Sequence, residues 1–81
     1  MSDQQIFQRI NDLAHEEETL WSQAGDGDGL DPADKERLDA IGVELDQCYD
    51  LLHQRQARRA AGLDPEDAEA RPAEVVERYL Q

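Results

Sequence analysis

One stripe of apolar side chains between residues 38 and 52 constrains the fold of this chain more than any other stretch. The members of the stripe are spaced three and four residues apart, so they share one face of a helix. Acidic residues occupy several of the positions between them and favour contact with water. A stripe this narrow is typical of a seam that is buried against a second helix. The residues of the stripe are Leu38, Ile41, Leu45, Cys48 and Leu52.

The N-terminal part of the chain can supply that second helix. Ser2 and Gln5 have the spacing of a capping box, which predicts a helix over about 3–24. This helix carries a matching stripe with one polar position, Glu17. The apolar members are Ile6, Ile10, Leu13, Leu20 and Ala24.

A short loop rich in Gly and Asp, at 25–30, separates the two helices. Asp31 is a suitable N-cap and Pro32 suits the first helical turn, so the second helix is expected over about 32–61. Gly62 then fits a left-handed helix stop. Because the connection is short, the two helices are expected to form an antiparallel hairpin.

In the register that the loop imposes, Ile6 lies near Leu52 and Ile10 near Cys48. The last two turns of the second helix then extend beyond the first helix. This overhang is the expected docking place for the C-terminal segment.

The C-terminal segment, 62–81, is expected to contain one more short helix. Pro72 disfavours helix at Arg71, so the helix is placed at about 73–80. Alone it is too short to persist, so it must dock on the hairpin or on another chain. The sequence therefore predicts a single small all-α domain, 1–81: an antiparallel helical hairpin with a short C-terminal helix docked on it.

Composition limits what this domain can bind. The net charge of −12 opposes binding to nucleic acid and to anionic membranes, and it suits a basic partner. Eighty-one residues with 38% apolar side chains leave a small core, so self-association is a real alternative to a closed monomer. A single cysteine, no signal-peptide pattern and no apolar run of about 20 residues predict a cytoplasmic protein.

Candidate chemical sites are weak. Asp12 and His15, and likewise Asp50 and His53, have a spacing that occurs in metal-binding bundles, but the hairpin register keeps the two pairs apart unless a dimer joins them. Counted from its first aspartate, the 26–31 loop lacks the ligands and the glycine that a calcium-binding EF-hand requires at positions five, six and twelve. No catalytic, metal or cofactor site is predicted, so the protein is expected not to be an enzyme and to need no cofactor.

Glu17 stands within the run of glutamates at 16–18 and is the one carboxylate of the first stripe. No nucleophile or oxyanion site accompanies this run. We expect Glu17 to bond across the hairpin to Arg37 or Lys35, or to set the register of the two helices.

Arg55, Arg58 and Arg59 share one face near the end of the second helix. One interpretation is structural: they complement the helix dipole and pair with carboxylates of the C-terminal segment. The other is a contact with an acidic protein surface or with RNA phosphate. The carboxylates available for pairing are Glu66, Asp67, Glu69 and Glu74.

A second row of side chains widens the apolar face of the first helix. Phe7, Ala14 and Trp21 recur every seven residues beside the stripe. Trp21 is expected to cap the core near the hairpin turn, and Tyr49 to face the final helix. Exposed aromatic residues are also favoured anchors of interfaces. The candidate partner-binding residues are therefore Phe7, Trp21, Tyr49, Arg55, Arg58, Arg59 and Tyr79.

Several segments resemble a small bacterial family of unknown function, catalogued as DUF2630. They are YDLLHQRQARR at 49–59, GLDP at 62–65, RP at 71–72 and VERYLQ at 76–81. The resemblance extends over essentially the whole chain and implies a short, mostly helical cytoplasmic protein. It implies no catalytic residues, because the family carries no assigned activity.

Three functions follow as expectations. The first is a non-enzymatic protein that acts through protein–protein contact and forms a homo-oligomer, with no small-molecule substrate and no membrane. The alternative is an RNA- or ribosome-associated factor that uses Arg55, Arg58 and Arg59. The third is a metal-dependent enzyme formed by the Asp-x-x-His pairs across a dimer.

Overall fold

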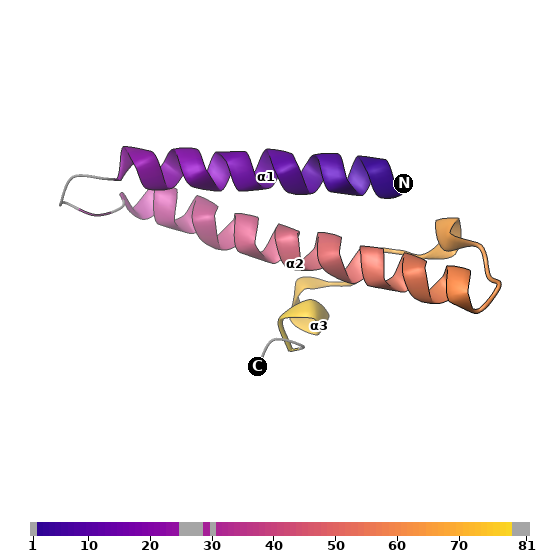
Figure 1. Cartoon of the computed structure of the whole chain (residues 1–81). Helices are drawn as coiled ribbons and strands as arrows, with labels where there is room; N and C mark the ends of the chain where they lie inside the picture. The colour runs from indigo at the N-terminus through magenta and orange to yellow at the C-terminus, as the bar shows by residue number, and fades with distance from the viewer. Residues whose placement is uncertain (1, 25–28, 30, 79–81) are drawn as a thin grey trace.

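The structure, a computed structural model, describes residues 2–24, 29 and 31–78, with side chains as far as Val76. Within these residues it contains three α-helices and one turn of 3-10 helix and no strand (Figure 1). The prediction of an all-α hairpin with a short third helix docked on it is confirmed. The elements are α1 (Asp3–Gln23), α2 (Pro32–Ala60), η1 (Pro65–Asp67) and α3 (Ala73–Arg78).

The first two helices begin where local chemistry satisfies their free N–H groups. Ser2 Oγ accepts a hydrogen bond from the Gln5 backbone N–H at 3.2 Å, and Gln5 Oε1 accepts one from the Ser2 N–H at 2.8 Å. This reciprocal pair is the predicted capping box. At the start of α2, Asp31 Oδ1 accepts from the Ala33 N–H at 2.9 Å, and Pro32 occupies the first turn.

The C-terminus of α2 is closed by Gly62, which has a φ of +75°. The Gly62 N–H donates to the Arg59 carbonyl at 3.1 Å, and the Leu63 N–H donates to the Arg58 carbonyl at 2.8 Å. These two bonds form a Schellman motif, in which the residue after the C-cap, here Gly62, has left-handed backbone angles. The chain can therefore reverse direction immediately after α2.

Replacing this glycine tests the stop signal. We expect Gly62→Ala to lower the free energy of unfolding by about 1 kcal/mol, because alanine is strained at this φ. Gly62→Asn is the matched control and should lose less, since asparagine tolerates the left-handed region. Urea denaturation of the three proteins measures the difference. Equal stability of wild type and Gly62→Ala would contradict the assignment.

The core lies between the two long helices. Ile6, Leu13 and Ile41 are completely buried. One cluster joins Ile6 and Ile10 of α1 to Leu51 and Leu52 of α2, in agreement with the predicted register. Leu51 lies outside the predicted stripe. Its burial shows that α2 has a second contact surface. Partly buried neighbours of the cluster are Leu45, Cys48 and Ala68.

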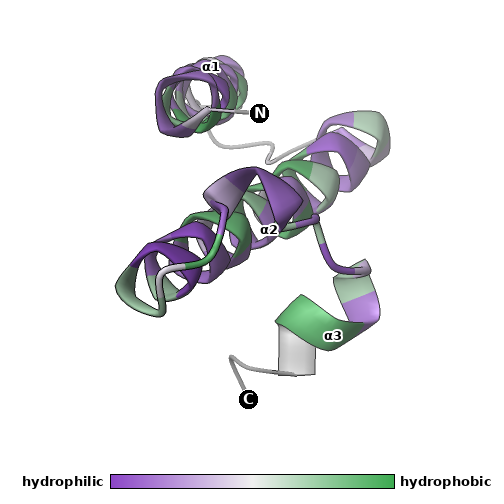
Figure 2. Ribbon diagram, turned by 90° about the vertical axis from the view of Figure 1, so that its right-hand side faces the viewer, coloured by the Kyte–Doolittle hydropathy of each residue, from purple (hydrophilic) through white to green (hydrophobic). Residues whose placement is uncertain are grey.

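That second surface holds the C-terminal segment. Figures 1 and 2 place α2 between α1 and α3, and within the described residues α3 contacts α2 and not α1. The predicted docking of the final helix on the overhang is wrong. There η1 packs instead, and the chain then runs back along α2, so that α3 reaches its middle. Val76 of α3 is 3% exposed in this position.

The three helices lie in a row that is one helix deep. The Cα trace extends over 52 × 25 × 15 Å, and its radius of gyration is 15.2 Å. A compact domain of this length has a radius of gyration of about 12 Å. The fold is therefore an elongated plate, and α1 and α2 are both open on its two broad sides. None of the described helices is both long and apolar enough to cross a membrane.

Candidate functional site

Ion pairs connect α1 and α2 along one side of the hairpin. Arg37 donates two hydrogen bonds to the carboxylate of Glu16, at 2.5 and 2.7 Å, and Arg9 bonds to Glu44 at 2.5 Å. Of the alternatives expected for Glu17, pairing with Arg37 is wrong, because Arg37 bonds to Glu16 and lies 3.9 Å from Glu44. One residue is 100° of helical turn, so Glu16 stands on the flank where Arg37 reaches it, whereas Glu17 points toward the seam.

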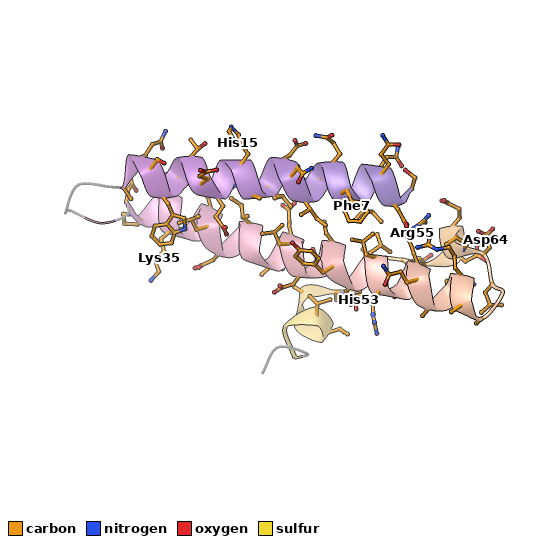
Figure 3. The ribbon with its side chains drawn as sticks, in the orientation of Figure 1. Phe7, His15, Lys35, His53, Arg55 and Asp64 are labelled. Carbon is orange, nitrogen blue, oxygen red and sulfur yellow. The ribbon has the colours of Figure 1, made fainter. Side chains whose placement is uncertain are left out.

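The opposite side of the hairpin carries two rows at spacing seven. The ion pairs show that one flank of α1 and one flank of α2 lie on the first side. By the helical periodicity, the opposite flanks of the two helices then lie together on the second side. The α1 row ends in Phe7 and Trp21, and Phe7 projects from the edge of α1 that borders α2 (Figure 3). We name the two rows together the aromatic face. It consists of Phe7, Ala14 and Trp21 of α1 and Gly42, Tyr49 and Gln56 of α2.

The large side chains of the aromatic face are exposed. Phe7 is 53% exposed, Trp21 57% and Tyr49 49%. The prediction that Trp21 caps the core is therefore wrong: it lies beside the core and is left in solvent. Tyr49 does not cover α3 either, because the helical periodicity turns it away from Gln47 and Gln54, which bond to the C-terminal segment.

Arg55 lies at the other end of the hairpin and is 5% exposed. It bonds to Asp3 Oδ1 at 2.5 Å, to the Pro65 carbonyl at 3.1 Å and to Glu66 Oε1 at 3.2 Å. One guanidinium therefore ties the start of α1, the end of α2 and η1 together (Figure 3). Glu66 is one of the predicted carboxylate partners, whereas Asp3 was not predicted. In an antiparallel hairpin, an acidic residue in the first turn of α1 faces the last turns of α2. This geometry could have predicted Asp3 as a partner of Arg55.

The two neighbouring arginines are engaged in the same way. Arg58 donates to the Asp64 carbonyl at 2.6 Å and contacts Asp67 at 3.4 Å, and Arg59 bonds to Asp3 at 2.8 Å. The structural interpretation of the arginine face, pairing with the C-terminal segment, agrees with these contacts for Glu66 and Asp67. The RNA interpretation stays a prediction.

These pairs make part of the stability depend on pH. The Arg55 guanidinium, and after it that of Arg59, lowers the pKa of Asp3 below its ordinary value. A lowered carboxyl pKa stabilises the folded state above the ordinary value of about 4 and loses that contribution as the pH falls further.

We therefore expect wild type to lose stability below about pH 4 more steeply than Asp3→Asn, which has no charge to lose. Thermal melts from pH 6 to pH 2.5 measure this difference, and Asp34→Asn serves as the control at an acid that forms no ion pair with any residue that the structure describes. Parallel profiles for wild type and Asp3→Asn would contradict the pairing.

Asp50 has a partner that sequence analysis did not predict. Its side chain is 11% exposed and accepts two bonds from Arg71, at 2.9 and 2.6 Å. Gln54 also donates to Asp50. Asp50 of the Asp-x-x-His pattern at 50–53 thus helps to dock the C-terminal segment.

The two histidines do not approach one another within the chain. His15 and His53 are both exposed, and Figure 3 shows them pointing from opposite sides of the hairpin. Among the described residues no group of three or more His, Cys, Asp or Glu side chains could hold a metal ion. Most of the candidate calcium loop, residues 26–28 and 30, lies outside the described residues, as does Tyr79.

Comparison with known proteins identifies the family. A family described as "Protein of unknown function (DUF2630)" matches residues 2–81, essentially the whole chain. The chain belongs to this family. It is 42% identical over 78 residues to the uncharacterised proteins Rv0898c of Mycobacterium tuberculosis and Mb0922c of Mycobacterium bovis, and the match covers 96% of this chain and 90% of each relative. No solved structure matches it significantly.

Proposed function

We propose that this protein acts by binding another protein through the aromatic face, in the cytoplasm, without catalysing a reaction. The observation that carries the proposal is the location of its aromatic residues. The sequence contains one Phe, one Trp and two Tyr, and three of these four stand exposed on one side of the hairpin. Within the described residues, the buried core is built from aliphatic side chains alone.

This small domain buries few apolar side chains, so the exposure of its large aromatic side chains calls for an explanation. Placing Phe7 or Trp21 in the core would remove about 150–250 Å² of surface from water for each ring. Tryptophan and tyrosine are also the residues most often found at the energetic centres of interfaces. A partner that covers the face would supply the burial that the hairpin itself does not.

The absence of acidic residues from the two rows also supports the aromatic face as the binding surface. The chain has 20 acidic residues among 81, yet neither row of the aromatic face contains one. Lys35 continues the α2 row by one further step of seven. An uncharged strip on a strongly acidic protein is a surface on which another protein can pack without burying carboxylates.

The test compares two matched substitutions. Trp21→Gln removes the largest aromatic side chain of the face. Leu63→Gln changes a hydrophobic residue of similar exposure, 53%, that lies beyond the end of α2 and is not a member of the face. Each protein, untagged and coupled to a resin, is incubated with native lysate of the source bacterium. We expect a protein, or more of this chain, to be retained by wild type and Leu63→Gln and lost with Trp21→Gln. Equal recovery on all three resins would overturn the proposal.

The arginine face offers the alternative. If the protein binds RNA through the face of Arg55, Arg58 and Arg59, the contact is made by Arg58 and Arg59, because Arg55 is buried. Such binding is salt-sensitive, and it should fail when Arg58 and Arg59 become Gln. The same lysate experiment tests RNA binding, because the nucleic acid retained on the resin can be measured with and without nuclease treatment.

A further inference from the structure

We infer that the protein which covers the aromatic face is a second copy of this chain, so that two hairpins pack face to face as a four-helix core. This inference rests on the proposed function and names its partner. Three features of the molecule support a second copy: its exposed surface area, its single row of helices, and Gly42.

The chain exposes more surface than a closed monomer of its size. Its accessible area is 5816 Å² for a mass of 9.2 kDa. A compact monomer of that mass exposes about 4,900 Å². The excess, about 900 Å², is close to the roughly 800 Å² that each partner contributes to an interface of standard size. The excess of this elongated chain is thus of the size that one interface would bury.

The layer structure of the fold indicates that the partner is a second layer of helices. Domains normally consist of two packed layers of secondary structure, and this fold has a single row of helices. The ion pairs between α1 and α2 make one broad side polar. The aromatic face is the other side of the hairpin, so a second layer of helices has one apolar side on which to pack.

Gly42 is the third observation. It stands in the middle of the 29-residue helix α2, where glycine costs up to about 1 kcal/mol relative to alanine. No contact among the described residues requires it, because a Cβ at this position would meet none of their atoms within 4 Å. A glycine inside a helix with empty space beside it suits the close approach of another helix.

The spacing of the α1 row fits a two-fold axis. Ala14 lies midway between Phe7 and Trp21, about 10 Å of helix from each. A two-fold axis over Ala14 places Trp21 of one copy against Phe7 of the other, and the reverse. Small residues, Ala14 and Gly42, then stand where the two hairpins come closest, and aromatic residues fill the two ends.

The charge of the chain restricts a second copy to the aromatic face. Each chain carries a net charge of −12, so two copies repel one another at most orientations. Contact through the two carboxylate-free rows keeps the acidic residues of both copies on the outside. The closed symmetry also leaves no second apolar face for further addition.

The experiment measures solution mass by light scattering after size exclusion, over a concentration series of the untagged chain. We expect wild type to have twice the chain mass of 9.2 kDa. Ala14→Glu, which brings two carboxylates together at the axis, should raise the dissociation constant at least about a hundredfold. His15→Glu is the matched control: it adds the same group one residue away, on an exposed position that points away from α2, and should remain dimeric.

A cross-link checks the geometry independently. In a Cys48→Ser background, Ala14→Cys should form a disulfide between two chains on oxidation, and His15→Cys should not. Circular dichroism confirms that each variant remains helical.

The outcomes separate this inference from the proposed function. A wild-type monomer at all concentrations overturns the second copy, and the proposed function stands if the lysate experiment still shows a partner that depends on Trp21. A dimer that resists Ala14→Glu as well as His15→Glu overturns the aromatic face as the self-interface. A dimer that only Ala14→Glu dissociates supports the inference.

Discussion

Replacing Leu13 by alanine is expected to remove about 2–4 kcal/mol from the free energy of unfolding. Leu13 is completely buried between the two long helices, so truncation leaves a cavity that the rigid seam fills only in part. A domain of this length has a total stability of roughly 4–12 kcal/mol. The loss is therefore a large share of it, and we expect the variant to be partly unfolded near 37 °C.

The control for this prediction makes the same change in solvent. Leu63 is 53% exposed, so Leu63→Ala should lower the stability by less than about 1 kcal/mol. Urea denaturation followed by circular dichroism at 222 nm compares both variants with wild type. A loss for Leu13→Ala no greater than that for Leu63→Ala would show that the core does not lie where the structure places it.

Replacing Arg71 by alanine is expected to release the C-terminal segment from α2. The six residues of α3 cannot persist as an isolated helix, so they depend on docking. That docking uses the two bonds from Arg71 to Asp50, the bond from Gln47 to the Arg71 carbonyl at 3.2 Å and the burial of Val76. Without the guanidinium, Asp50 is left as a largely buried carboxylate that has lost its charged partner.

Hydrogen exchange measures the release. We expect the backbone amides of α3 to exchange at least about ten times faster in Arg71→Ala, and the amides of α1 to keep their protection. Asp50→Arg combined with Arg71→Asp restores the pair in reverse and should recover much of the protection. If Arg71→Ala leaves the exchange of α3 unchanged, apolar contacts alone hold the segment.

Much of the hairpin could be predicted because its determinants are local. The capping box at Ser2 and Gln5, the start at Asp31 and the stop at Gly62 each depend on a few neighbouring residues. The three-four spacing of the apolar residues predicts which faces meet. The pairing of Ile6 with Leu52 then follows from the short connection.

The partners of individual charges could not be predicted in the same way. Glu16 and Glu17 differ by 100° of helical turn, and Arg37 bonds to Glu16 and not to Glu17, which was one of the expected pairings. Twenty carboxylates compete for eight basic residues, so composition does not decide the pairs. Arg71 and Asp50, or Arg55 and Asp3, are brought together only when distant segments are placed in three dimensions.

The sequence by itself determined the helices, their ends and the antiparallel hairpin, because these depend on dihedral preferences and hydrogen bonds within a few residues. Only the tertiary structure decided that α3 packs on the middle of α2, that Arg55 joins three elements, and that Trp21 stays in solvent. The physical reason is that a helix has several usable flanks, and the packing of remote segments selects which of them is buried. On this hairpin it leaves the flank of Phe7, Trp21 and Tyr49 uncovered.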